Sequence, residues 1–171
     1  QIENLVNEFS DFARMPKPIL KDNDVVTITK DNISLLKELD KTIEINIKTM
    51  KNNIFFNSDS EQLSRVFFNL IKNSIESIQE KKKNNPNFNG KIDIEVNDNE
   101  INIEFIIKDN GVGFKIFDDK IKDILNPYFT TKEKGTGLGL AIVNKIINDH
   151  NGTLNFTSLN DGAKIKIEFK K

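Results

Sequence analysis

The chain has 171 residues, which is enough for one well-filled core but not for two full domains. Its 25 Lys and Arg balance 26 Asp and Glu, and the net charge of -1 excludes the strongly basic field that nucleic acid or an anionic membrane would select. The absence of Cys excludes disulfides and thiolate metal sites. No apolar run approaches the ~20 residues that span a bilayer, so we expect a soluble, cytoplasmic piece without direct membrane contact, whether or not its parent is anchored in the cell membrane.

The first residues predict an amphipathic helix that ends near Met15. Apolar side chains recur at three- and four-residue spacings from Ile2 to Ala13. The pattern is already in progress at Gln1, so we expect the end of a longer helix. Two prolines in the segment 15–18 stop it, because each lacks an amide donor. We therefore predict a helix stub and linker over 1–18 and one domain over 19–171.

From residue 19 onward, the spacing of apolar residues predicts a mixed α and β domain. Strict alternation predicts hairpins over 92–107 and 154–169 and a strand over 43–47. Helical spacing predicts a short helix over 33–39, a longer one over 63–78, and a third after the glycines at 135–139. The Lys81–Lys83 run is predicted to lie in a solvated loop. Hairpins with helices between them favour an α+β fold, a two-layer sandwich with a mixed, mostly antiparallel sheet and helices on one face.

The first segment that could carry chemistry is Asp109-Asn110-Gly111-Val112-Gly113-Phe114, directly after a predicted strand. A carboxylate there can accept a hydrogen bond from an exocyclic amine, and the glycines let a flat ring approach the backbone. Taken alone, the segment fits a tight turn equally well.

The second is Gly135-Thr136-Gly137-Leu138-Gly139-Leu140, which opens a predicted helix. Amides at a helix N-terminus, together with the positive end of the helix dipole, can hold a phosphate chain without a basic side chain. On its own the run can equally serve flexibility. It is neither a Walker loop nor a Rossmann fingerprint, because the final Gly-Lys-Ser/Thr and the preceding strand are missing.

The third is the predicted helix around Asn69 and Asn73, two amides four residues apart on one face. Neutral amide oxygens suit a Mg²⁺ ion that keeps its waters and takes further oxygens from nucleotide phosphates. Read alone, this is a solvated polar face.

Together and in this order, the three segments resemble the N, G1 and G2 boxes of the ATPase superfamily that includes gyrase, the mismatch-repair ATPases and histidine kinases. Pro127–Lys132 also resembles the F box that anchors a mobile ATP lid. The resemblance spans roughly residues 60 to 152 and implies a Bergerat-type fold that binds ATP and Mg²⁺ between the Asn69 helix and the lid. It assigns Asp109 to the adenine amino group, Gly111 and Gly113 to the purine pocket, Asn73 to Mg²⁺, and Asn69, Asn73 and Lys72 to catalysis. The remaining nucleotide contacts that it implies are Phe129, Thr131, Lys132, Gly135, Thr136, Gly137, Leu138, Gly139 and Leu140.

Asn69 indicates the branch of the superfamily. In relatives that hydrolyse ATP with water, and in anti-sigma-factor serine kinases, this position is usually a Glu acting as general base. An amide cannot accept a proton at neutral pH. The resemblance therefore favours a sensor histidine kinase, which transfers the γ-phosphoryl group to a histidine supplied by another domain. Asn4–Pro16 further resembles the end of the second dimerisation helix of nitrogen-regulation sensors of the NtrY type.

Two residues depart from this pattern or need a separate interpretation. Many histidine kinases carry Lys or Arg where this chain has Glu76, so Lys72 or Lys132 is a candidate for that charge. His150, the sole histidine, follows the third predicted helix. We interpret it as a surface or packing residue and expect the phosphoacceptor upstream of Gln1.

The expected function is therefore that of a histidine kinase catalytic domain that needs partners. These are its own dimerisation and phosphoacceptor domain, a second copy in a homodimer, and the receiver domain of a response regulator. Without the acceptor histidine, the isolated chain should show little self-phosphorylation. The alternatives are a non-catalytic nucleotide-sensing or dimerisation module and an anti-sigma-factor-type serine kinase.

Overall fold

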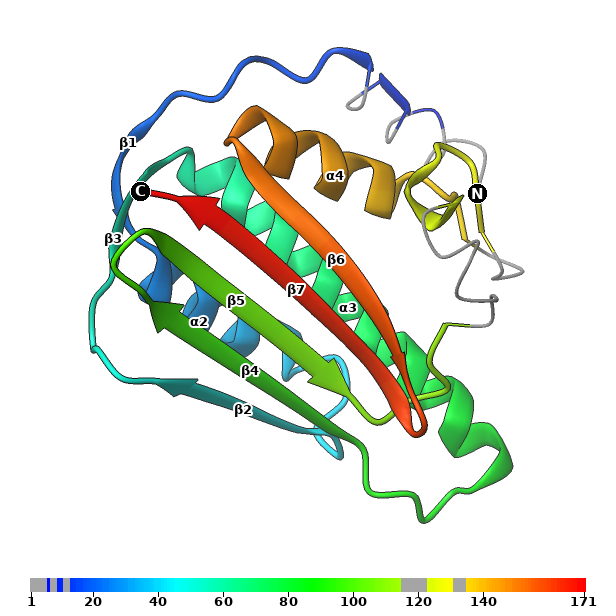
Figure 1. Ribbon diagram of the computed structural model, residues 1–171. Coiled ribbons are helices and arrows are strands. Elements are labelled where there is room, and N and C mark those ends of the chain that lie inside the picture. The colour runs from blue at the N-terminus through cyan, green and yellow to red at the C-terminus, as the bar shows by residue number, and fades with distance from the viewer. Residues whose placement is uncertain (1–5, 7–8, 11–12, 115–122, 131–134) are drawn as a thin grey trace.

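The computed structural model describes residues 6, 9–10, 13–114, 123–130 and 135–171, and within these ranges five strands form one sheet (Figure 1). The strands are β2 (Glu44–Thr49), β4 (Lys91–Asp98), β5 (Asn102–Asp109), β6 (Gly152–Leu159) and β7 (Gly162–Lys170), in the spatial order β2-β4-β5-β7-β6. β2 runs parallel to β4, and the other neighbours are antiparallel. Both predicted hairpins are thus confirmed.

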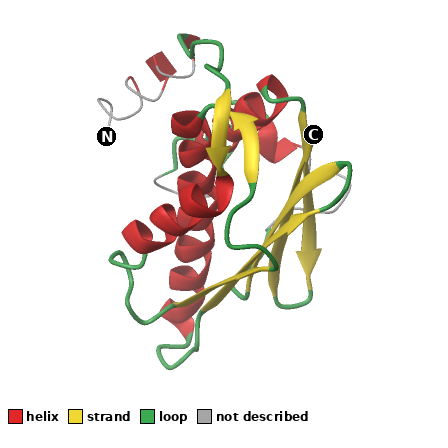
Figure 2. Ribbon diagram, turned by 90° about the vertical axis from the view of Figure 1, so that its left-hand side faces the viewer, coloured by secondary structure: helices red, strands yellow, loops and turns green. Residues whose placement is uncertain are grey.

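The helices α2 (Val25–Leu36), α3 (Ser60–Asn84) and α4 (Gly139–Asp149) cover the same face of this sheet (Figure 2). α3 crosses the middle of the sheet, and its apolar stripe is almost fully buried. The inward residues of β5 meet that stripe, and the rings of Phe67 and Phe105 lie 4.9 Å apart. The expected two-layer sandwich with helices on one face is confirmed.

α2 differs from the prediction in both of its ends. The helix begins at Val25, eight residues before the predicted start at Ile33, and it ends at Leu36, so that Leu39 lies beyond it and is exposed. Asp24 caps the N-terminus, because its carboxylate accepts hydrogen bonds from the Val26 amide at 3.2 Å and the Thr27 hydroxyl at 2.6 Å. This cap outweighs the strand preference of the β-branched residues that follow it.

α3 is longer than predicted, and the loop predicted for Lys81–Lys83 is wrong. The Asp59 carboxylate caps the helix by accepting from the amides of Glu61 and Gln62, and the helix continues to Asn84. The three lysines form its last turn, where positive charge is favourable against the negative end of the helix dipole. The charge run therefore ends a helix.

A second, two-stranded sheet was not predicted from the sequence. β1 (Lys21–Asp24) pairs antiparallel with β3 (Phe55–Ser58). The Asp59 carboxylate at the end of β3 also accepts from the Ile19 amide at 2.8 Å, and the Gln62 side chain donates to the Pro16 carbonyl at 3.0 Å. These contacts attach the proline segment to the start of α3.

At the N-terminus, the described residues Val6, Phe9, Ser10 and Ala13 are helical, in agreement with the predicted helix. Val6 and Phe9 are exposed, and the Phe9 ring stacks on that of Tyr128 with centroids 6.3 Å apart. Across the described ranges, no helix combines the length and apolar character that a membrane span requires.

Candidate functional site

Asp109 is the last residue of β5, and it is buried, with 6% of the residue's surface exposed. The Ser74 hydroxyl of α3 donates to Oδ2 at 3.0 Å, and the Gly111 amide donates to Oδ1 at 2.9 Å. Burial raises the pKa of Asp109 above its ordinary value, although these two hydrogen bonds and the charge of Lys81 oppose the shift. The carboxylate is therefore held in a fixed orientation by α3 and by its own loop.

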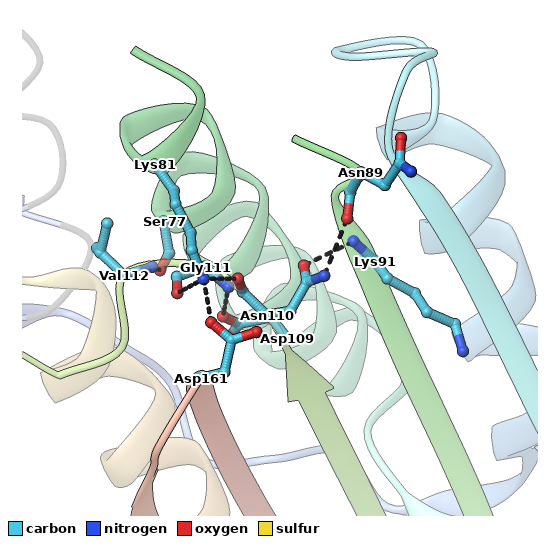
Figure 3. A network of polar contacts seen from close by, with 9 residues as sticks. All are labelled: Ser77, Lys81, Asn89, Lys91, Asp109, Asn110, Gly111, Val112 and Asp161. Atoms are coloured by element: carbon cyan, nitrogen blue, oxygen red, sulfur yellow. Dashed lines mark hydrogen bonds and ion pairs between the residues drawn. The ribbon is translucent and has the colours of Figure 1, made fainter. Parts of the chain in front are cut away.

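The loop that follows Asp109 packs closely against α3 (Figure 3). The Val112 amide donates to the Ser77 hydroxyl at 3.0 Å and to the Ser77 carbonyl at 3.3 Å. A Cβ atom on Gly111 would lie 2.3 Å from the Ser77 hydroxyl oxygen and 2.8 Å from the Ile78 amide nitrogen. Only glycine fits there, so the backbone of this loop lies directly on the helix.

The predicted catalytic residues Asn69, Lys72 and Asn73 lie on the same helix, within the five positions before Ser74. Asn69 is partly buried, and its amide donates to the Arg65 carbonyl at 2.9 Å. Asn73, one turn later, is also partly buried. The Lys72 ammonium lies 3.9 Å from a Glu76 carboxylate oxygen, and both side chains are substantially exposed. Lys72 therefore faces solvent beside an acidic neighbour.

The glycine-rich segment leads into α4 next to the first residues of the predicted F box. The Tyr128 amide donates to the Gly137 carbonyl at 3.0 Å. Gly137 has a φ of +70°, and a Cβ there would lie 2.4 Å from the Tyr128 carbonyl carbon and 2.8 Å from the Phe129 amide nitrogen. Phe129 is partly buried, whereas Gly135 is exposed and Thr136 only partly buried.

The N-terminus of α4 has no side-chain cap. Leu138 stands at the cap position with its side chain fully buried. Its amide donates to the Thr136 hydroxyl at 3.4 Å, and its carbonyl accepts from the Ile142 amide at 2.9 Å. The first turn, which includes Gly139 and the partly buried Leu140, contains no acidic residue. Amides at such a helix end suit an anion.

α3 connects the two halves of the candidate site. The Asn69 amide oxygen lies 3.2 Å from where a Cβ of Gly139 would stand, and the Ser74 hydroxyl holds Asp109. Asn69 and Ser74 are five positions apart, which corresponds to about 7–8 Å along the helix axis. The carboxylate and the start of α4 therefore lie along one helix. Thr131 and Lys132 lie outside the described residues.

The donor set can be compared with what a metal ion needs. Among the residues that the structure describes, no group of three or more His, Cys, Asp and Glu could hold a metal. A hard cation at Asn73 would therefore need oxygens from a ligand, such as phosphates, in addition to the amide. This fits a Mg²⁺ ion that arrives with a nucleotide.

Four residues at this site were not recognised from the sequence: Ser74, Ser77, Lys81 and Gly162. Ser74 and Ser77 carried a usable signal, because a hydroxyl on or beside the apolar stripe of a buried helix needs a partner. Lys81 and Gly162 contact the Asp109 loop from distant parts of the chain.

His150 has a packing role, which is one of the two alternatives predicted for it; the other, a surface position, is wrong. It is 5% exposed, and its Nε2 atom accepts from the Asp59 amide at 3.0 Å. Its Nδ1 atom lies 2.8 Å from the Ile146 carbonyl oxygen, so the proton resides on Nδ1. His150 thus joins the end of α4 to the start of α3.

Comparison with known proteins places the chain in a family. The family described as histidine kinase-, DNA gyrase B-, and HSP90-like ATPases matches residues 58–171. The putative sensor histidine kinase NtrY-like of Rickettsia prowazekii (strain Madrid E) is 35% identical over 169 residues, which cover 98% of this chain and 27% of the relative. The chain thus spans about a quarter of the length of the curated relatives it matches.

Solved structures agree in fold. The nucleotide-free catalytic domain of the histidine kinase ThkA has a TM-score of 0.76 at 26% identity, over 89% of this chain and 95% of that one. Full-length ShkA with AMPPNP has a TM-score of 0.82 at 22% identity, over 98% and 35%. ThkA in complex with the response regulator TrrA has a TM-score of 0.79 at 22% identity, over 99% and 47%. The chain belongs to the family of histidine kinase-, DNA gyrase B-, and HSP90-like ATPases.

Proposed function

We propose that this chain is the ATP-binding catalytic domain of a sensor histidine kinase and that it transfers the γ-phosphoryl group of ATP to a histidine upstream of residue 1. The observation that carries the proposal is the placement of two complementary groups on one helix. The buried Asp109 carboxylate contacts Ser74 of α3, and the uncapped start of α4 lies against Asn69 of the same helix. One group suits an amine-bearing base and the other suits a phosphate chain.

In the proposed complex, the adenine amino group donates to Asp109, and the glycine backbone at 111 and 113 lets the ring approach. The phosphates lie against residues 135–140, with Phe129, Thr131 and Lys132 on the lid side, and Asn73 supplies an oxygen to Mg²⁺. The bound Mg²⁺ neutralises phosphate charge. Asn69 cannot accept a proton, so the domain contributes positioning and electrostatic stabilisation rather than base catalysis. Many histidine kinases carry Lys or Arg at the position of Glu76, and here Lys72 or Lys132 would supply that positive charge.

One of the proposed partners, a response regulator, is supported by a relative of known structure. ThkA has been solved with the response regulator TrrA, and we propose that a receiver domain is likewise the final acceptor here. We also propose that residues 1–18 lead from a dimerisation and phosphoacceptor domain into a catalytic domain over 19–171, that the parent is a cytoplasmically facing homodimer, and that nucleic acid is not a partner.

The phosphotransfer itself can be tested by mixing the chain with a separately produced dimerisation domain and ATP labelled at the γ-phosphate. We expect label on a histidine of the dimerisation domain, recognised by the acid lability of a phosphorus–nitrogen bond. The same domain with its acceptor histidine replaced by Gln is the control and should stay unlabelled. ATP binding without label transfer would favour the non-catalytic nucleotide-sensing module instead, and label on a serine would favour the serine kinase.

The affinity for ATP should fall on acidification. Burial raises the pKa of Asp109, so this carboxylate gains its proton at a higher pH than an exposed one. The neutral carboxyl group is a weaker acceptor for the adenine amine, because it has lost its charge and one of its oxygens has become a donor. Calorimetric titrations from about pH 8 to about pH 5 would reveal the loss. Inosine triphosphate, whose base lacks the amine, controls for titration of the phosphates. Equal pH dependence of the two affinities would argue against ionised Asp109 as the base contact.

A further inference from the structure

Lys81 extends from the last turn of α3 to the loop that follows Asp109 (Figure 3). Its ammonium donates to the Asn110 carbonyl at 2.8 Å and to the Gly111 carbonyl at 3.2 Å. It also pairs with the Asp161 carboxylate in the turn between β6 and β7. An ammonium group has three hydrogens, and these three acceptors use all of them.

The surroundings hold this ammonium in place. The Lys81 side chain is 26% exposed, and its nitrogen lies 4.4 Å from the centre of the Phe88 ring. A cation over an aromatic face is stabilised there, and its aliphatic stem is kept from free rotation. Lys83, two residues later on the same helix, is exposed, and so the two lysines differ although the sequence places them in one run.

The two carbonyls that Lys81 holds belong to Asn110 and Gly111, the two residues that follow Asp109. The loop has two other attachments, one through the Asn110 side chain and one through the Val112 amide. Asn110 is fixed to the start of β4, because its side chain donates to the Asn89 carbonyl at 2.9 Å and accepts from the Lys91 amide at 2.8 Å. Ser77 holds the Val112 amide. Between these two attachments, Lys81 donates to the Asn110 carbonyl, which belongs to the same peptide unit as the Gly111 amide. That amide donates to the Asp109 carboxylate and so orients it.

We propose that Lys81 is a positioning residue for base selection: by holding the Asn110 and Gly111 carbonyls, it aims the Asp109 carboxylate at the exocyclic amine of the nucleotide. This inference rests on the proposed role of Asp109. It assigns to Lys81 a share in the preference for an amino-purine over an oxo-purine, although Lys81 itself touches no nucleotide. A mere surface lysine would contribute nothing to that preference, and a purely structural lysine would affect all nucleotides alike.

The test is the ratio of the affinities for ATP and inosine triphosphate, measured by calorimetry on the full chain. For Lys81→Met, which keeps the length and apolar stem but loses the donors, we expect ATP affinity to fall about tenfold. Inosine triphosphate should lose about twofold or less, because its base offers no amine to Asp109. The ratio should therefore shrink about fivefold.

Lys83→Met is the matched control and should leave both affinities unchanged. Lys81→Gln keeps two N–H donors on a shorter stem, so its affinity ratio should lie between those of the wild type and Lys81→Met. Thermal denaturation shows whether Lys81→Met folds. If it does not fold, Lys81→Gln takes its place in the test. An unchanged ratio in folded Lys81→Met, or an equal loss for both nucleotides, would overturn the inference. Failure of the wild type to bind ATP would instead count against the proposed function itself.

Discussion

Replacing Asp109 with Asn should weaken binding of an ATP analogue by about 100-fold or more. The carboxylate oxygens already accept from Ser74 and Gly111 and still have lone pairs for a further donor. An Asn side chain offers one oxygen for these donors and puts an NH₂ group in the place of the other oxygen. That NH₂ would face either the adenine amine or one of the two protein donors, so at least one donor is left unpaired.

The same substitution should not destabilise the empty protein. Burial raises the pKa of Asp109, so the folded state holds this proton more tightly than the unfolded state does. Stability therefore falls as the pH rises from the unfolded pKa through the folded one, and at neutral pH the ionised carboxylate is a net cost. The amide that replaces it would carry no charge, and without nucleotide its oxygen can accept from the Gly111 amide while its NH₂ donates to the Ser74 hydroxyl, which accepts as well as donates. Thermal denaturation of Asp109→Asn without nucleotide should therefore give a Tm equal to or above that of the wild type.

Asp31→Asn is a matched control, because Asp31 is an exposed carboxylate on α2. It should change neither the affinity nor the Tm. If Asp109→Asn bound the analogue as tightly as the wild type does, the assignment of the base site would be wrong. If Asp109→Asn lost binding and also had a lower Tm than the wild type, the ionised carboxylate would stabilise the empty protein. That result would contradict the expectation that its burial is a net cost at neutral pH.

The parts of the fold that were predicted correctly are those with local signals. β4 alternates between apolar and polar residues, and β5 does so except at Ile106, so a period of two is visible in a short window. The bounds of α2 and the small β1–β3 sheet were predicted wrongly or missed, because they do not depend on a periodic apolar pattern. The start of α2 depends on a single capping carboxylate, and β1 is too short and polar to show a pattern.

The candidate site divides in the same way. Asp109 and the glycine-rich segment were recognised because their order along the chain resembles a family, and α3 lies against both. Lys81 was misjudged because its partners are distant in sequence: Asn110 lies 29 positions away and Asp161 lies 80 positions away. No local pattern reports such contacts. The roles of Thr131 and Lys132, which fall outside the described residues, stay predictions.

Replacing Gly162 with Ala should lower the free energy of unfolding by about 3 kcal/mol or more. Gly162 begins β7 with a φ of +106°, a conformation that L side chains rarely adopt. An added Cβ would lie 1.9 Å from the Asp109 carbonyl oxygen and 2.8 Å from the Asn110 Cα, so backbone would have to move on both sides of the turn.

Urea denaturation measures this loss, and Asn160→Ala, an exposed position in the same turn, is the control that should stay within about 0.5 kcal/mol of the wild type. Because the added Cβ would clash with the carbonyl of Asp109 itself, the folded molecules of Gly162→Ala should also bind ATP more weakly than the wild type does. Wild-type stability in this variant would mean that the turn can move away from Asp109 at little cost. The β6–β7 turn would then not help to fix the carboxylate, and its close packing against the Asp109 loop would have no bearing on nucleotide binding.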